Sequence, residues 1–161
     1  MTTTAPETTY TAEPGSLEAT TLAVIDAPRE AVYRCFTDPD LLPRWWSPPE
    51  LEVRIEKFAK SPGEAWRIIN VDADGNEYAF RGVIHDAVKN ERICQTFEFE
   101  GEPGNVALQA AAFEDAEGGR TRVSEQIVFQ SIEARDGMSE AGMKDFAPVG
   151  MAQLQEVAQS L

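Results

Sequence analysis

The segment "DAPREAVYRCFTDPDLLPRWW", residues 26–46, decides the fold prediction because it contains two helix starts and a proline-limited end. Pro28 stands at a first helical turn, where a missing N–H leaves no hydrogen bond unmade. The apolar residues that follow recur at the i, i+3 and i+4 spacing of one buried helix stripe, namely Val32, Cys35 and Phe36. Pro43 then limits the next helix to about one turn. The segment therefore predicts two short helices in succession.

The sequence on both sides of these helices indicates strands and one long helix. Residues 17–26 predict a strand, and from residue 51 to about residue 130 polar and apolar residues alternate with a period of two. The stretches "ADGN" and "AEGGR" are glycine-containing hairpin turns within that region. Helical spacing returns from Gly137 to the end of the chain. This order predicts an α+β fold in which about six to seven antiparallel strands curve around a long C-terminal helix.

Composition narrows the function classes. Of the 161 residues, 28 are Asp or Glu and 14 are Lys or Arg, and the resulting net charge of -14 repels nucleic acid and anionic membranes. Cys35 and Cys94 lie far apart and His85 is the only histidine, so we expect reduced thiols in a cytoplasmic protein, no metal site and no cofactor. No apolar stretch is long enough for membrane insertion. Residues 1–16, rich in Thr, Pro and Glu, predict a disordered leader before a single domain at 17–161.

The chain also resembles a known family. The stretches "DAPREAVYRCFTDPDLLPRWW", "DGNEYAFRG" and "SEAGMKDF" are similar to bacterial homologues of the heat-shock chaperone ATPase activator. That family belongs to the START-like (SRPBCC, Bet v-like) helix-grip superfamily, and the resemblance covers residues 17–161. It implies a helix-grip fold with a cavity between the curved sheet and the last helix. It specifies function only weakly, because the superfamily includes carriers, cyclases, sequestering proteins and co-chaperones.

The chain departs from the family pattern in the turn "SPGE", residues 61–64, where many relatives have Arg-Pro-Gly-Gly, and again near the start of the last helix. Phe146-Ala147 stands where relatives often have Gly-Trp, and Pro148 follows directly. Within a helix, proline removes a hydrogen bond and clashes with the preceding turn, so we expect a kink or break there and a firm helix from about Pro148. The segment 138–147 is then either a mobile flap over the cavity mouth or a rigid kink without function.

The resemblance implies which alternate residues of each strand face the concave side of the sheet. Around residues 108–113 the phase with Gln109, Ala111 and Phe113 inward is preferred over the phase with Leu108, Ala110 and Ala112, and the sequence leaves both open. The expected ligand-binding residues on that face and around it are Trp45, Trp46, Trp66, Asn70, Tyr78, Phe80, Gln95, Phe97, Phe99, Gln109, Phe113, Glu125, Met143 and Phe146. In the same phase His85 faces outward and is an ordinary surface histidine. For the two tryptophans, we expect one to pack under the helix with Leu41 and the other to line the rim of the cavity.

Polar residues among these aromatic side chains suggest the chemistry of the cavity. An unpaired buried polar group costs about 1–3 kcal/mol, so several together imply hydrogen bonds to one another, water or a ligand. Glu125 lies between Val123 and Ile127, where burial would raise its pKa and suit it to act as a general base or ligand acceptor. The alternative is a bulge that turns Glu125 to solvent.

Three functions follow from this reading. The first is binding of a small hydrophobic or aromatic molecule for sequestration, transport or sensing. The second is a cyclase- or hydrolase-type enzyme in which Glu125 and Tyr78 act as base and acid. The third, implied by the family resemblance, is a co-chaperone-like interaction domain of the stress response. An antiparallel sheet with exposed edges also allows a homodimer.

Overall fold

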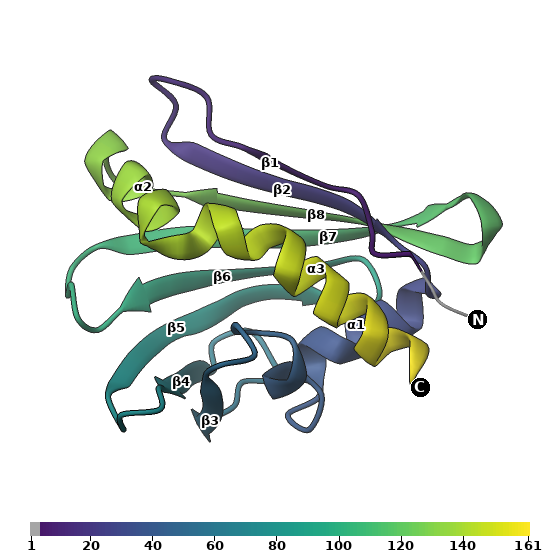
Figure 1. The fold of residues 1–161 in the computed structure, drawn as a ribbon, viewed down its shortest axis with the longest axis horizontal. Helices are drawn as coiled ribbons and strands as arrows, with labels where there is room; N and C mark the ends of the chain where they lie inside the picture. The colour runs from purple at the N-terminus through teal and green to yellow at the C-terminus, as the bar shows by residue number, and fades with distance from the viewer. Residues whose placement is uncertain (1–3) are drawn as a thin grey trace.

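The computed structural model describes residues 4–161 as one curved antiparallel sheet with helices on its concave face (Figure 1). The strands are β1 Thr8–Thr11, β2 Glu18–Ile25, β3 Glu52–Lys57, β4 Ala65–Val71, β5 Glu77–Val88, β6 Arg92–Phe99, β7 Val106–Ala116 and β8 Arg120–Val128. The α-helices are α1 Arg29–Thr37, α2 Ile132–Met138 and α3 Lys144–Gln159. Short helical turns are η1 Leu42–Arg44 and η2 Glu117–Gly119, and η3 Ser139–Met143 is π-helical.

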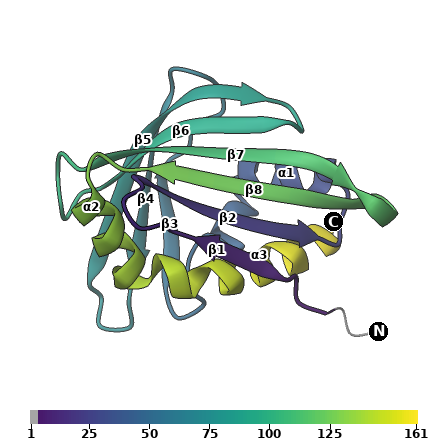
Figure 2. The same cartoon turned by 90° about the horizontal axis from the view of Figure 1, so that it is seen from above.

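The sheet has the order β1-β2-β8-β7-β6-β5-β4-β3, and every neighbouring pair is antiparallel. Seen from above, the strands bend over α3, which runs across their concave side (Figure 2). The buried core includes Ile25, Val32, Val123 and Leu154, so side chains from the sheet, α1 and α3 meet in one layer. The predicted helix-grip α+β fold is confirmed, with eight strands instead of six to seven.

The additional strand, β1, lies in the segment predicted to be a disordered leader, and that prediction is wrong for the described part of it. Thr8–Thr11 pair with Thr20–Ala23 of β2. Tyr10 packs against the core, and its hydroxyl lies 2.5 Å from Ser139 Oγ. Threonine and tyrosine favour strands, and an edge strand with one buried face needs few apolar residues, so composition alone did not reveal it. Residues 1–3 lie outside the described part of the chain.

Arg135 on α2 fastens the turn between β1 and β2. Its side chain is only 4% exposed and donates hydrogen bonds to the backbone carbonyl oxygens of Glu13 and Ser16, the second at 2.6 Å. Asp136 accepts a further bond from the same guanidinium at 2.8 Å. The N-terminal hairpin and the helices over the cavity are therefore held together by a buried charge.

The expected break at Pro148 is absent, and the irregularity lies earlier. α3 begins at Lys144 and continues through Pro148, whereas η3 contains Gly142 with a φ of 130°. Pro148 is exposed and is the fifth residue of α3, so its missing N–H removes only the bond to the first carbonyl of the helix. Glycine is the residue that adopts such a positive φ without strain, which explains why the chain changes direction at Gly142.

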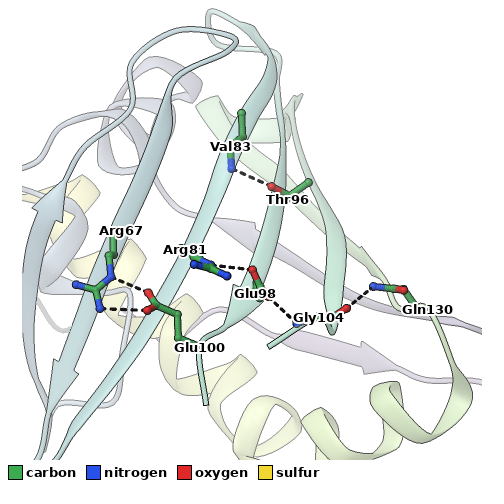
Figure 3. A network of polar contacts seen from close by, with 8 residues as sticks. All are labelled: Arg67, Arg81, Val83, Thr96, Glu98, Glu100, Gly104 and Gln130. Carbon is green, nitrogen blue, oxygen red and sulfur yellow. Dashed lines mark hydrogen bonds and ion pairs between the residues drawn. The ribbon is translucent and has the colours of Figure 1, made fainter. Parts of the chain in front are cut away.

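The convex face of β4, β5 and β6 carries a network of charges (Figure 3). Arg67 binds Glu100 through two hydrogen bonds of 2.6 and 3.2 Å, and Arg81 donates to Glu98 at 2.8 Å. Glu98 also accepts a bond from the backbone N–H of Gly104 at 2.8 Å. These bonds lower the pKa of Glu98, the bond from Arg81 most of all. The network fixes the β6–β7 loop on the face opposite the helices.

Candidate functional site

A cavity of about 630 Å³ lies between the concave face of the sheet and the segment from α2 to α3. Its volume is within the range of about 300–1,000 Å³ that is usual for small-molecule sites. Side chains from every strand except β3 contribute to its wall, together with α1, η1 and the residues from Met138 to Met151 that line it from the helical side. Exposed lining residues such as Tyr78, which is 40% exposed, lie where the cavity meets solvent.

One end of the cavity is built from aromatic rings. Phe80 on β5 lies 5.4 Å from Phe97, 5.2 Å from Phe99 and 5.4 Å from Trp46, measured between ring centroids. Trp66 on β4 lies 6.1 Å from Phe97. Alternation along the strands brings these rings to one face, because residues two apart point the same way. We call these five residues the aromatic wall.

The position of Trp66 depends on a glycine in the neighbouring strand. Gly82 pairs with Trp66 across β4 and β5, and a Cβ at position 82 would lie 1.9 Å from the Thr96 carbonyl oxygen and 2.7 Å from the Trp66 indole nitrogen. No larger residue fits without moving backbone. Gly82 therefore allows the Trp66 indole to lie flat against β5.

The two adjacent tryptophans have different surroundings. Trp45 is 6% exposed, packs against Phe36 with ring centroids 4.5 Å apart, and donates its indole N–H to the Cys35 carbonyl at 2.9 Å. Trp46 is half-buried and meets the edges of Trp66 and Phe80. Both reach the cavity, but Trp45 belongs to the core and Trp46 to the aromatic wall.

The loop that follows these tryptophans is held by hydrogen bonds from two directions. Ser47 donates to the side-chain oxygen of Asn70 on β4 at 2.8 Å, and both side chains are buried. Gln153 on α3 donates to the carbonyl oxygens of Trp45 and Ser47 at 3.2 and 3.0 Å. The tryptophans are thereby positioned relative to both the sheet and α3.

Most of the polar residues expected in the cavity are paired. Gln95 donates to Gln109 at 2.8 Å across β6 and β7, and Asn70 is bound to Ser47. Tyr78 donates its hydroxyl to Asp72 at 3.2 Å in the β4–β5 turn. This bond to a carboxylate raises the pKa of Tyr78, which makes its hydroxyl a weaker acid.

Glu125 differs from these residues because its carboxylate has no hydrogen bond or ion pair within residues 4–161. It lies on β8 between Thr21 of β2 and Ala111 of β7, and it faces the cavity as Val123 and Ile127 face the interior. Burial raises the pKa of Glu125 to about 7. No bulge interrupts the pairing of β8 with either neighbour, so the alternative in which Glu125 points to solvent is excluded.

Glu125 and Tyr78 lie at different ends of the cavity. The row of paired residues that contains Glu125 continues through Ala111 and Ile93 to Ala87 on β5. Tyr78 is nine positions from Ala87 along β5, about 30 Å of strand. The sheet therefore does not bring these two groups together as an acid–base pair.

The remaining expected site residues divide into those at the cavity and those elsewhere. Met143 and Phe146 line the cavity from the helical side, but Phe113 does not reach it. Phe113 is 2% exposed and packs its ring edge-on against Tyr33 and Phe36 beneath α1, so its assignment to the site is wrong. The prediction that the Phe113 side chain points to the concave face of the sheet is correct, but α1 covers that end of β7 and separates Phe113 from the cavity.

Several residues that line the cavity are not marked as cavity residues by any pattern in the sequence. They come mostly from segments without strand periodicity or from the N-terminal segment, and they include Tyr10, Thr21, Phe36, Leu42, Leu51, Phe58 and Ala141. The helical spacing that marked Phe36 indicated only burial, and nothing in the sequence separated a core position from a cavity position there.

Other reactive chemistry is sparse in the part of the chain that the structure describes. Within residues 4–161 no three His, Cys, Asp or Glu side chains are grouped as metal ligands require. Burial raises the pKa of the Cys35 thiol to about 11, so this group is a poor nucleophile. No helix in this range is long and apolar enough to cross a membrane.

Comparison with known proteins identifies the family of this chain. The model of the family "Activator of Hsp90 ATPase homolog 1-like protein" matches residues 26–159. The chain belongs to this family. The resemblance to the START-like superfamily that the sequence suggested is thereby confirmed. β1 and β2 precede the matched residues. No curated protein matches the chain significantly.

Solved structures of bacterial proteins have the same fold. A protein from Arthrobacter aurescens superposes with a TM-score of 0.85 at 21% identity, covering 95% of this chain and 92% of that one. Protein Ms6760 from Mycobacterium smegmatis gives 0.83 at 20% identity, covering 92% and 94%. A Rhodobacter sphaeroides protein gives 0.83 at 21% identity, covering 96% and 100%. At these identities the likeness concerns the fold alone.

Proposed function

We propose that this protein binds a small hydrophobic or aromatic molecule in the cavity between the sheet and α3. The observation that carries the proposal is the cavity of about 630 Å³, lined by the aromatic wall at one end and by methionines of the helical side. A well-packed interior leaves few voids larger than a water molecule, so a space of this size requires an occupant or water. Its mostly apolar lining favours an apolar occupant.

The arrangement of polar groups supports recognition without turnover. Gln95, Gln109, Asn70 and Tyr78 are engaged in hydrogen bonds, which orient the wall. Within residues 4–161 the Glu125 carboxylate and the Trp66 indole N–H are lining groups left without a hydrogen bond, and of these two only the carboxylate can carry a charge. The acid–base pair expected for catalysis, Glu125 and Tyr78, lies at opposite ends of the cavity and so cannot act on one reacting atom. Sequestration, transport and sensing are the roles that fit a binding cavity of this kind.

The family description favours a second candidate, a protein-interaction role like that of the chaperone activator for which the family is named. Such a role would use exposed apolar surface. Trp45 and Trp46, the adjacent tryptophans, do not supply such a surface, because Trp45 lies in the core and Trp46 on the aromatic wall. We therefore rank this role second.

Fluorescence titration with the neutral probe N-phenyl-1-naphthylamine tests the proposal. We expect saturable binding, loss of binding in Ala147→Phe, which fills the cavity from α3, and full binding in Val149→Phe, on the exposed face of the same helix. Circular dichroism establishes that both variants fold. If the wild type does not bind the probe, or if both variants bind it equally, the cavity is not the binding site.

A further inference from the structure

The position of Glu125 specifies one end of the ligand. Its neighbours across the sheet are Thr21 and Ala111, and its neighbours on the same face of β8 are Val123 and Ile127. None of these carries a charge, and within residues 4–161 none of the described groups bonds to the Glu125 carboxylate. A carboxylate without a partner is expensive to bury, so a site that contains one gains free energy from any ligand that supplies the partner.

Within residues 4–161 no positively charged side chain pairs with the Glu125 carboxylate. Among the lining residues of the described chain, the charged side chains are Glu125 and Lys60, and Lys60 is exposed in the β3–β4 loop. From the helical side the cavity is faced by uncharged residues, among them Met143, Phe146 and Met151. Tyr10, on the strand beyond β2 and in the same row as Glu125, directs its hydroxyl to Ser139. Tyr78 is bound to Asp72.

The aromatic wall specifies the other end. The row of Glu125 passes through Ala111 to Ile93 on β6, and Phe97 is four positions further along that strand, about 13 Å. Resting on the proposed binding function, we propose that the cavity selects molecules with a protonated amine at one end, paired with Glu125, and an aromatic or apolar body that reaches the aromatic wall. The substrate class is therefore an amphiphilic or arylalkyl amine.

The test compares two probes that differ in one group, 6-phenylhexylamine and 6-phenylhexan-1-ol, by titration calorimetry at pH 8. A hydrogen-bonded charge in this position corresponds to about 10- to 100-fold in affinity, so we expect the amine to bind that much more tightly than the alcohol. In Glu125→Gln the preference should disappear while the alcohol still binds. Glu140→Gln, which removes an exposed carboxylate from η3, is the matched control and should keep the preference.

The pH dependence of binding gives a second readout. The amine is protonated at pH 8 and at pH 5.5, but Glu125 takes up a proton as the pH falls through about 7. Amine affinity at pH 5.5 should therefore be about 30-fold lower than at pH 8, while alcohol affinity is nearly constant. Equal binding of both probes at pH 8, or a preference that survives in Glu125→Gln, overturns the amine inference alone. If neither probe binds, the binding function fails and the inference fails with it.

Discussion

The unpaired Glu125 carboxylate predicts a measurable defect in the stability of the unliganded protein. Burial raises the pKa of Glu125 from its ordinary value of 4.5 to about 7. A raised carboxyl pKa means that the folded protein holds the proton more tightly than the unfolded chain. Below pH 4.5 Glu125 is protonated in both states and does not lower the free energy of unfolding. As the pH rises from 4.5 to about 7 the free energy of unfolding falls progressively, and above about 7 the full destabilisation is present.

The size of this destabilisation follows from the pKa of Glu125 in the unfolded and in the folded protein. At about 1.4 kcal/mol per pH unit, the interval from 4.5 to about 7 corresponds to about 3 kcal/mol at pH 8. Glu125→Gln replaces the carboxylate with a neutral group of the same shape. We expect this variant to be more stable than the wild type by about 3 kcal/mol at pH 8, or about 6–12 °C in melting temperature, and nearly equal to it at pH 4.5.

The assay is urea unfolding of both proteins at pH 4.5, 6 and 8, with the difference between them taken at each pH. This difference cancels the titration of all other carboxylates. Glu91→Gln, at an exposed position in the β5–β6 turn, is the control for the removal of a carboxylate from the protein surface. If Glu125→Gln differs from the wild type by the same amount at every pH, the carboxylate is not buried without a partner and the reasoning is refuted.

Three further predictions concern the architecture around the cavity. Trp45→Phe loses the hydrogen bond from the indole N–H to the Cys35 carbonyl and should lower the free energy of unfolding in urea by about 1–3 kcal/mol. Trp46→Phe should change the free energy of unfolding by less than about 1 kcal/mol and should reduce the fluorescence change on ligand binding. A larger loss of stability in Trp46→Phe than in Trp45→Phe would contradict the two assignments. Arg135→Gln should speed amide hydrogen exchange in Thr8–Thr11 without affecting β6, and unchanged exchange in β1 would show that the arginine does not hold that strand. Gly82→Ala should lower stability by about 3 kcal/mol or more in thermal unfolding, because its Cβ meets the Thr96 carbonyl; a stable variant would contradict the close approach of β5 and β6.

The fold was predictable where the chain follows a simple period. Alternation along β4, β5 and β6 indicated which residues face inward, because a shift of one residue would turn their aromatic side chains outward. For β7 and β8 the sequence left the register open, and the uninterrupted pairing of these strands places Glu125 inward. The phase that the family resemblance supplied agrees with the observed pairing. The strand residues of the aromatic wall could therefore be predicted from the sequence, whereas the choice between Trp45 and Trp46 was left open.

The remainder depends on contacts that no local pattern reveals. β1 pairs with β2, and the turn between them is held by the buried Arg135, which is more than 100 residues away in the sequence. The composition of the segment alone therefore suggested disorder. Pro148 suggested a break in α3, but an exposed proline in the second turn costs little, and the left-handed Gly142 determines where the helix is irregular. Whether Phe113 lies in the core or in the cavity depends on where α1 packs, and periodicity does not supply that information.

Methionine methyl groups offer the most direct test of the central claim, which is that a small molecule occupies the space between the sheet and α3. Met138, Met143 and Met151 all line the cavity from the helical side. In protein labelled with ¹³C at the methionine methyl groups, saturating N-phenyl-1-naphthylamine should shift all three resonances, because an aromatic ring would lie against them, and Ala147→Phe should abolish the shifts. Saturable binding of the probe with all three resonances unmoved would place it elsewhere on the protein and contradict the account.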